Sequence, residues 1–121
     1  MLVVTRYTVP AGEAAEFQEL CRAAVEVLVA CPGCTGASAG PALDDPTLWV
    51  LSSSWESVGA YRRALSSYQV KLVAVPLMYR ALDEPSAFES LLSWTPQGGL
   101  HEEESAIGSV AAAAADGERA G

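Results

Sequence analysis

The segment Trp49-Val-Leu-Ser-Ser-Ser-Trp55-Glu-Ser-Val-Gly-Ala-Tyr61 changes its spacing of large apolar residues half-way along. Up to Trp55 every second residue lies on one face, which is typical of a β-strand. Beyond it, Val58, Tyr61 and Leu65 follow at steps of three and four, which indicates a helix. The segment predicts a strand that runs into a helix, with Trp55 at the junction. A large aromatic residue between a sheet and its covering helix is a common pocket component.

The rest of the chain supplies elements of the same two kinds. Residues 2–9 alternate around β-branched and aromatic side chains, which predicts a strand with Val3, Thr5, Tyr7 and Val9 on one face. An apolar stripe through residues 13–30 predicts an amphipathic helix. The expected elements in chain order are a strand (2–9), a helix (13–30), two antiparallel strands (35–42 and 47–55), two short helices (57–66 and 68–75) and a strand (86–94).

This order of elements predicts an α+β fold of the ferredoxin-like βαββαβ kind. Such a sandwich has a four-stranded antiparallel sheet with the helices on one face. The first strand is apolar on both faces, with Val3 and Val9 on one side and Leu2 and Val4 on the other. A sheet that is apolar on both faces needs cover on both. We therefore expect a homodimer in which the bare sheet faces pack together.

The composition indicates which kinds of binding partner and which cellular compartment to expect. Half of the 121 residues are hydrophobic, yet no apolar run is long enough to span a membrane. A net charge of −8 argues against nucleic acid or an anionic membrane as the partner. The first residues do not form a secretory signal, and three cysteines, an odd number, fit a reducing compartment. We expect a cytoplasmic protein.

The charged residues are unevenly distributed. Residues 95–121 carry five acidic and one basic side chain among many alanines and glycines. This composition predicts a domain of residues 1–94 followed by an acidic, disordered tail of residues 95–121. Within the domain, residues 57–82 contain no acid and four basic side chains: Arg62, Arg63, Lys71 and Arg80.

Several short motifs occur in an order typical of a known family: Pro10-Ala-Gly-Glu13, Pro32-Gly33, Trp49-Val-Leu, and Trp55-Glu-Ser followed by Tyr61. Together with the order of elements, they resemble the antibiotic biosynthesis monooxygenase (ABM) domain family of dimeric α/β barrels over roughly residues 1–94. The resemblance implies a cofactor-independent monooxygenase that oxidises an aromatic or polyketide-like small molecule.

The resemblance also separates two chemical branches of that family. The haem-degrading branch uses an Asn, a Trp and a His, at positions where this chain has Thr5, Ala64 and Ala74. The only histidine, His101, falls in the expected tail, so no axial haem ligand is expected in the domain. The quinone-forming branch has a Trp that matches Trp55 and an amide side chain that Leu51 replaces here.

The implied site lies between the sheet and the helices. We expect catalytic roles for Trp55, by stacking on the substrate, and for Tyr61, by relaying a proton. Hydroxyls among apolar residues suit the orientation of a phenol or quinone, and arginines suit an anionic ligand. Each feature also has a structural explanation: a core tryptophan, hydroxyls bonded to backbone, and a solvated helix face. The expected substrate contacts are Thr5, Tyr7, Leu51, Ser53, Tyr68 and Arg80.

The sequence gives little support for a redox-active cysteine pair, a zinc site or a phosphate-binding loop. Cys31 and Cys34 follow the expected end of a helix, where the helix dipole disfavours a thiolate, so we interpret Cys31-Pro-Gly-Cys34 as a helix stop. A zinc site would need a second pair of ligands. No phosphate loop is present, and we expect neither a metal nor a cofactor.

Two functions of different classes remain open. The first is the cofactor-independent monooxygenase described above. The second is a non-catalytic dimeric module that binds a ligand or a partner on the same fold, because a fold alone does not establish a function. The apolar Leu51 and the lack of a histidine in the domain favour the second.

Overall fold

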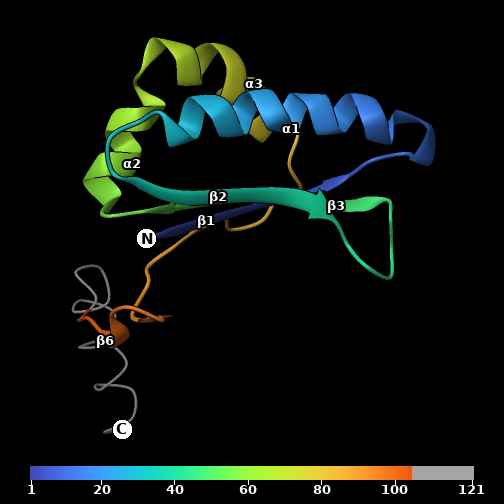
Figure 1. Ribbon diagram of the computed structural model, residues 1–121. Coiled ribbons are helices and arrows are strands. Elements are labelled where there is room, and N and C mark those ends of the chain that lie inside the picture. Colours follow the sequence, from blue (N-terminus) through green and yellow to red (C-terminus); the bar gives the residue numbers. More distant parts are fainter. Residues whose placement is uncertain (105–121) are drawn as a thin grey trace, which may run out of the picture. The chain divides into compact units, whose positions relative to one another are not determined.

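The computed structural model describes residues 1–104 (Figure 1). Contacts divide the chain into two units, Met1–Phe88 and Glu89–Gly121. The first unit contains the sheet and the helices, and the described part of the second contains a hairpin. None of the described helices is long and apolar enough to cross a lipid bilayer.

The first unit has the predicted α+β ferredoxin-like architecture. Its four strands pair in the order β2-β3-β1-β4, antiparallel throughout. The strands are β1 (Leu2–Thr8), β2 (Cys34–Pro41), β3 (Leu48–Trp55) and β4 (Ala87–Phe88), and the helical elements are η1 (Ala11–Glu13), α1 (Ala14–Val29), α2 (Val58–Leu65), η2 (Val70–Ala74) and α3 (Val75–Met78).

The helices lie on one face of the sheet, with α1 running along it (Figure 1). The residues of β1 that alternate toward this face are buried, as the sequence predicts. They pack with the apolar stripe of α1: Val3 and Tyr7 from the strand, Val9 directly after it, and Phe17, Cys21, Ala24 and Leu28 from the helix. On the opposite face, Leu2 is 39% exposed and Arg6 is also exposed. The core therefore lies between the helices and one side of the sheet.

The junction after Trp55 is built by local interactions that the sequence indicates. Ser57 is the N-cap of α2, and its hydroxyl accepts a hydrogen bond from the backbone N–H of Ala60 at 3.1 Å. Gly33 has φ +89°, and a Cβ there would lie 2.5 Å from the Cβ of Ala60. Only glycine fits this conformation and this close approach. The turn before β2 thereby packs directly on the start of α2.

The helix predicted to stop before Pro76 continues to Met78. It contains a π-turn, in which the N–H of Val75 bonds to the carbonyl of Val70, five residues earlier. This turn shifts the hydrogen-bond register, so that Pro76 falls in the first turn of α3. Proline is tolerated there because that position needs no intrahelical N–H donor.

The fourth strand is shorter than the predicted 86–94. Only Ala87 and Phe88 pair with β1, while β5 (Leu92–Thr95) pairs with β6 (Gly99–Glu102) as a separate hairpin. The turn forms because Gly99 adopts φ +68° and the N–H of Gly98 bonds to the Thr95 hydroxyl at 2.9 Å.

The predicted disordered tail also needs correction. Residues 95–102 carry regular structure, since they contain the end of β5, the turn and all of β6. The remainder of the predicted tail, residues 105–121, lies outside the described residues. The division of the chain at residue 94 stays a prediction.

Candidate functional site

The hydroxyl-bearing residues on the helix-covered face of the sheet are buried. The Thr5 hydroxyl donates to the carbonyl of Leu51 at 3.3 Å and lies 2.8 Å from the Tyr7 hydroxyl. Because threonine has one proton to give, Tyr7 is the donor of that second bond. Both hydroxyls are thereby bonded inside the protein.

A second internal pair lies further along the same face. The indole N–H of Trp55 donates to the Ser53 hydroxyl at 2.8 Å, and Trp55 is only 3% exposed. Among the described residues, no buried side-chain nitrogen or oxygen lacks a partner. The interior therefore satisfies its own polar groups and offers none of them to a ligand without rearrangement.

Tyr61 differs from these interior residues. Its ring packs against Trp55 at a centroid distance of 5.5 Å and an interplanar angle of 53°, and it is 8% exposed. Within residues 1–104, its hydroxyl bonds to no other group. Tyr61 instead lines a groove of about 400 Å³ together with Leu65, Lys71, Val75, Met78 and Tyr79.

A neighbouring hollow of about 340 Å³ shares Met78 and Tyr79 with this groove. Thr5, residues 81–84 and Ser86 also line it. Met78 and Tyr79, at the end of α3, therefore border both openings.

Tyr7 and Tyr61 are both protonated at neutral pH, and burial favours that form further. Burial raises the pKa of Tyr61 above its usual value of 10.0 and does the same for Tyr7, whose bond to Thr5 partly offsets the rise. At neutral pH the Tyr61 hydroxyl is thus a hydrogen-bond donor with no acceptor in the described protein. A ligand oxygen in the groove supplies such an acceptor.

The structure separates the residues that the sequence assigns to one site. Thr5, Tyr7, Leu51, Ser53 and Trp55 are buried in the interior, where Thr5 also borders the neighbouring hollow, and Tyr61 lines the groove. Tyr68 is 74% exposed and is not among the residues that line the groove.

Arg80 lies in a different environment. Its guanidinium stacks over Phe17 at 5.7 Å from the ring centroid and borders a small hollow with Glu13 and Glu16. The roles of Tyr68 and Arg80 in substrate binding stay predictions.

The sequence prediction missed five residues that line the groove: Leu65, Lys71, Val75, Met78 and Tyr79. All of them lie in residues 57–82, which contain no acidic side chain, and this feature of the sequence could have indicated the groove. What the sequence does not reveal is the π-turn, which extends the helix beyond Pro76 and brings Met78 and Tyr79 to the groove.

No metal centre is indicated in residues 1–104. No group of three histidine, cysteine or carboxylate side chains is placed to hold an ion. Cys21, Cys31 and Cys34 are free thiols, and Cys31 and Cys34 direct their sulfurs to the backbone carbonyls of Val27 and Gly36.

Comparison with known families gives a match to the profile described as antibiotic biosynthesis monooxygenase, over residues 1–74. This chain belongs to the ABM family. The matched range includes β1, β3, α2 and η2, which carry Thr5, Trp55, Tyr61 and Lys71. Comparison with curated proteins gives no match.

Solved structures agree with the ABM fold. A conserved protein from Methanosarcina mazei aligns with a TM-score of 0.59 and 19% identity, over 85% of this chain and 91% of that one. A Deinococcus radiodurans protein, provisionally named an antibiotic biosynthesis monooxygenase, aligns with a TM-score of 0.58 and 17% identity, over 88% of this chain and 96% of that one. At such identities the likeness concerns the fold alone.

Proposed function

We propose that this ABM-family protein is a cofactor-independent monooxygenase that oxidises an aromatic or polyketide-like small molecule in the groove beside Tyr61. The observation that carries the proposal is the hydroxyl of Tyr61, a residue only 8% exposed: it is protonated, has no hydrogen-bond partner within residues 1–104, and belongs to a side chain that lines the groove. An unpaired donor at the edge of a hydrophobic pocket is suited to fix the orientation of a ligand oxygen.

The lining of the groove favours a planar anionic aromatic ligand. Leu65, Val75 and Met78 supply apolar surface, and Tyr61 and Tyr79 supply ring faces and edges. Lys71 adds a positive charge at the same groove. A phenolate satisfies all three features, and a volume of about 400 Å³ suits a molecule of two or three fused rings.

A phenolate of this kind can react with oxygen without a bound cofactor. In an anthrone, the ring CH2 becomes C=O: one atom of O2 forms the new carbonyl, and the other leaves as water with both hydrogens. The carbon supplies all four electrons, so no external reductant is required. The protein contributes desolvation, orientation and stabilisation of the phenolate by the Tyr61 donor and the Lys71 charge.

The origin of the phenolate sets an expected pH dependence. The residues that line the groove include no carboxylate and no imidazole. The substrate proton therefore passes to solvent rather than to a protein base, and turnover rises as pH passes through the pKa of the bound substrate.

The proposal includes a cytoplasmic homodimer formed through the bare sheet face. Two apolar side chains at adjacent positions on that face, Leu2 and Phe88, are 39% and 46% exposed. Burial of such a surface against a second copy would complete the sandwich.

Oxygen uptake with a panel of hydroxylated anthrones and quinols tests the proposal. We expect turnover by the wild type, a fall in kcat of roughly tenfold or more for Tyr61→Phe, and little change for Tyr7→Phe. Tyr7→Phe is the matched control, because it deletes the same atom from the closed interior. Equal losses in the two variants, or no turnover of any panel member, would contradict the proposal.

A non-catalytic ligand-binding module is the second candidate, and one observation favours it. Leu51, at the position where the resemblance places an amide, is 3% exposed, and its apolar side chain cannot stabilise an oxyanion. Binding of the panel molecules that depends on Tyr61, without oxygen uptake, would establish this second function in place of the first.

A further inference from the structure

The hollow beside the Tyr61 groove differs from that groove in its chemistry. Met78 and Tyr79 line both openings, and the charged side chain in the lining of the groove is Lys71, a cation. The lining of the hollow instead carries hydroxyls and carboxylates, from Thr5, Asp83, Glu84 and Ser86. A molecule that occupies both openings must therefore have two ends of different character.

The hollow lies at a bulge in the segment that runs beside β1 ahead of β4. The N–H of Val4 bonds to the carbonyl of Ser86 at 2.7 Å, and the N–H of Leu82 bonds to the carbonyl of Arg6 at 2.8 Å. Between these two bonds β1 has one residue, Thr5, whereas the opposite segment has three. The extra residues cannot pair with β1 and form a bulge, a feature that commonly borders functional sites.

Two polar side chains of the hollow are free to bind a ligand. The carboxylate of Glu84 is already engaged by the guanidinium of Arg6, whose Nε and Nη2 donate to its two oxygens at 2.6 and 2.8 Å. The carboxylate of Asp83 and the hydroxyl of Ser86 have no such partner within residues 1–104. Asp83 thus offers an acceptor, and Ser86 both a donor and an acceptor, to a molecule in the hollow.

Met78 borders both openings with a side chain that can change its shape. It is the last residue of α3, is half-buried, and packs against the core. Methionine is unbranched and has three rotatable bonds, so it adapts to the outline of a neighbouring group. A ligand can therefore extend from the groove into the hollow across a side chain that adjusts to it.

We propose that the hollow is a subsite for a sugar attached to a substrate whose aromatic rings lie in the Tyr61 groove. The proposal rests on the function proposed above and deepens it by naming the substrate class, an aromatic glycoside. The sugar reaches the hollow across Met78, and its hydroxyls bond to Asp83 and Ser86. A volume of about 340 Å³ for the hollow is within the range of small-molecule sites.

The free groups of the hollow favour hydroxyls over an ammonium group. Asp83 is exposed, and an ion pair at an exposed site adds little affinity. A hydrogen bond from a neutral hydroxyl to a carboxylate is charge-assisted and does not require a second charge. A sugar hydroxyl can also accept a hydrogen bond from Ser86, which an ammonium group cannot. The lining therefore matches a neutral sugar better than an amine.

Calorimetric titration of the full chain with a hydroxyanthraquinone and with its mono-O-glucoside tests the subsite. We expect the wild type to bind the glucoside roughly fivefold or more tightly than the aglycone, and Asp83→Ala and Ser86→Ala each to lower this ratio of affinities to about two or less. Tyr61→Phe should weaken both ligands and keep the ratio. A wild type that binds the glucoside no more tightly than the aglycone, or a ratio that either hollow variant leaves unchanged, would overturn the proposal.

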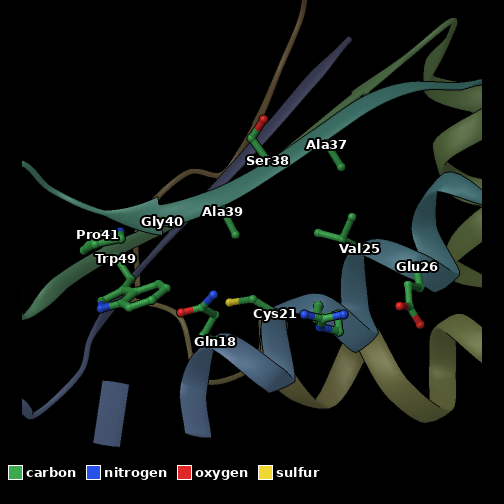
Figure 2. A pocket seen from close by; sticks show the side chains of 11 residues that line it. Gln18, Cys21, Val25, Glu26, Ala37, Ser38, Ala39, Gly40, Pro41 and Trp49 are labelled. Atoms are coloured by element: carbon green, nitrogen blue, oxygen red, sulfur yellow. The ribbon is translucent and has the colours of Figure 1, made fainter. Parts of the chain in front are cut away.

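A third groove supplies the matched control. It has a volume of about 420 Å³ and runs between β2 and α1 (Figure 2), and all of its lining residues differ from those of the groove and the hollow. Glu26 lines this third groove and is exposed, as Asp83 is. Glu26→Ala deletes a carboxylate that the proposal does not use, so it should keep the wild-type ratio. An equal fall in Glu26→Ala and Asp83→Ala would trace the effect to net charge and contradict the subsite.

A third probe and the aglycone itself separate the remaining outcomes. An aminoalkyl hydroxyanthraquinone, whose appendage is cationic, should gain less affinity over the aglycone than the glucoside does. A larger gain for the amine would show a cation site and overturn the proposal. Binding of the aglycone that depends on Tyr61, without any gain for the glucoside, would refute the subsite alone. If neither ligand shows binding that depends on Tyr61, the function proposed above fails together with the subsite.

Discussion

Tyr7 and Tyr61 are both almost fully buried, yet they belong to two different regions of the molecule. Tyr7 is 1% exposed and its hydroxyl is bonded to Thr5, inside a closed network on the sheet. Tyr61 is 8% exposed, and its hydroxyl bonds to nothing in residues 1–104 at the border of an open groove. Burial alone therefore does not distinguish the two tyrosines, whereas the hydrogen-bond partner of the hydroxyl does.

The largest expected effect concerns the closed region. Trp55→Ala removes a core indole and leaves the Ser53 hydroxyl without its donor, so the free energy of unfolding should fall by about 3–5 kcal/mol. Trp94→Ala is the matched control, because Trp94 is 66% exposed, and it should change stability by less than about 0.5 kcal/mol. Urea denaturation measures both, and a loss below about 1 kcal/mol for Trp55→Ala would break the assignment of Trp55 to the core.

A smaller effect separates the two tyrosines directly. Tyr7→Phe deletes one buried hydrogen bond while Thr5 keeps Leu51 as its acceptor, so it should cost about 1 kcal/mol of stability. Tyr61→Phe deletes no intramolecular bond and should leave stability nearly unchanged. The urea midpoints of the two variants measure this difference in stability. A larger loss of stability in Tyr61→Phe than in Tyr7→Phe would contradict the assignment of the hydrogen bond to Tyr7.

The sequence predicts the buried face of the sheet better than the groove, because the first depends on residues close together in the chain and the second does not. The alternation through Trp49 to Trp55 predicts the buried face correctly, because strand periodicity is local, and Ser57 correctly predicts the start of α2. Lys71 and Met78 both line the groove, and they lie on either side of the π-turn that carries the helix past Pro76. No local pattern indicates that turn.

The same limit explains the misplaced fourth strand. Residues 86–94 look like one strand, but the glycine turn at residues 98–99 allows Leu92–Thr95 to pair with Gly99–Glu102 instead. Competition between two pairings of one segment depends on geometry that a sequence pattern does not contain.

Alkaline titration tests the effect of burial on the phenols of Tyr7 and Tyr61. The folded state holds Tyr7 and Tyr61 with raised pKa values, so it binds more protons than the unfolded chain above pH 10.0. Their contribution is fully present below that pH and is lost as pH rises through the folded pKa values. Urea midpoints between pH 8 and 11 should therefore fall above pH 10.0 more steeply in the wild type than in Tyr7→Phe or Tyr61→Phe.

The smallest expected effect belongs to the groove. Lys71→Gln should weaken the binding of an anionic hydroxyanthraquinone by roughly two- to fivefold, and added salt should reduce the difference. Arg62→Gln, on the exposed face of α2, is the control and should bind as the wild type does. Fluorescence titration at two salt concentrations measures both, and equal affinities of the two variants would remove Lys71 from the site.

The most direct test of the account is calorimetric titration of a hydroxyanthraquinone into the wild type, Tyr61→Phe and Tyr7→Phe. The central claim is that the free hydroxyl of Tyr61, and not the paired hydroxyl of Tyr7, binds the ligand oxygen. The account predicts that Tyr61→Phe weakens binding by about tenfold or more while Tyr7→Phe retains the wild-type affinity. Weakened binding in Tyr7→Phe with unchanged binding in Tyr61→Phe would place the ligand in the interior and contradict the account.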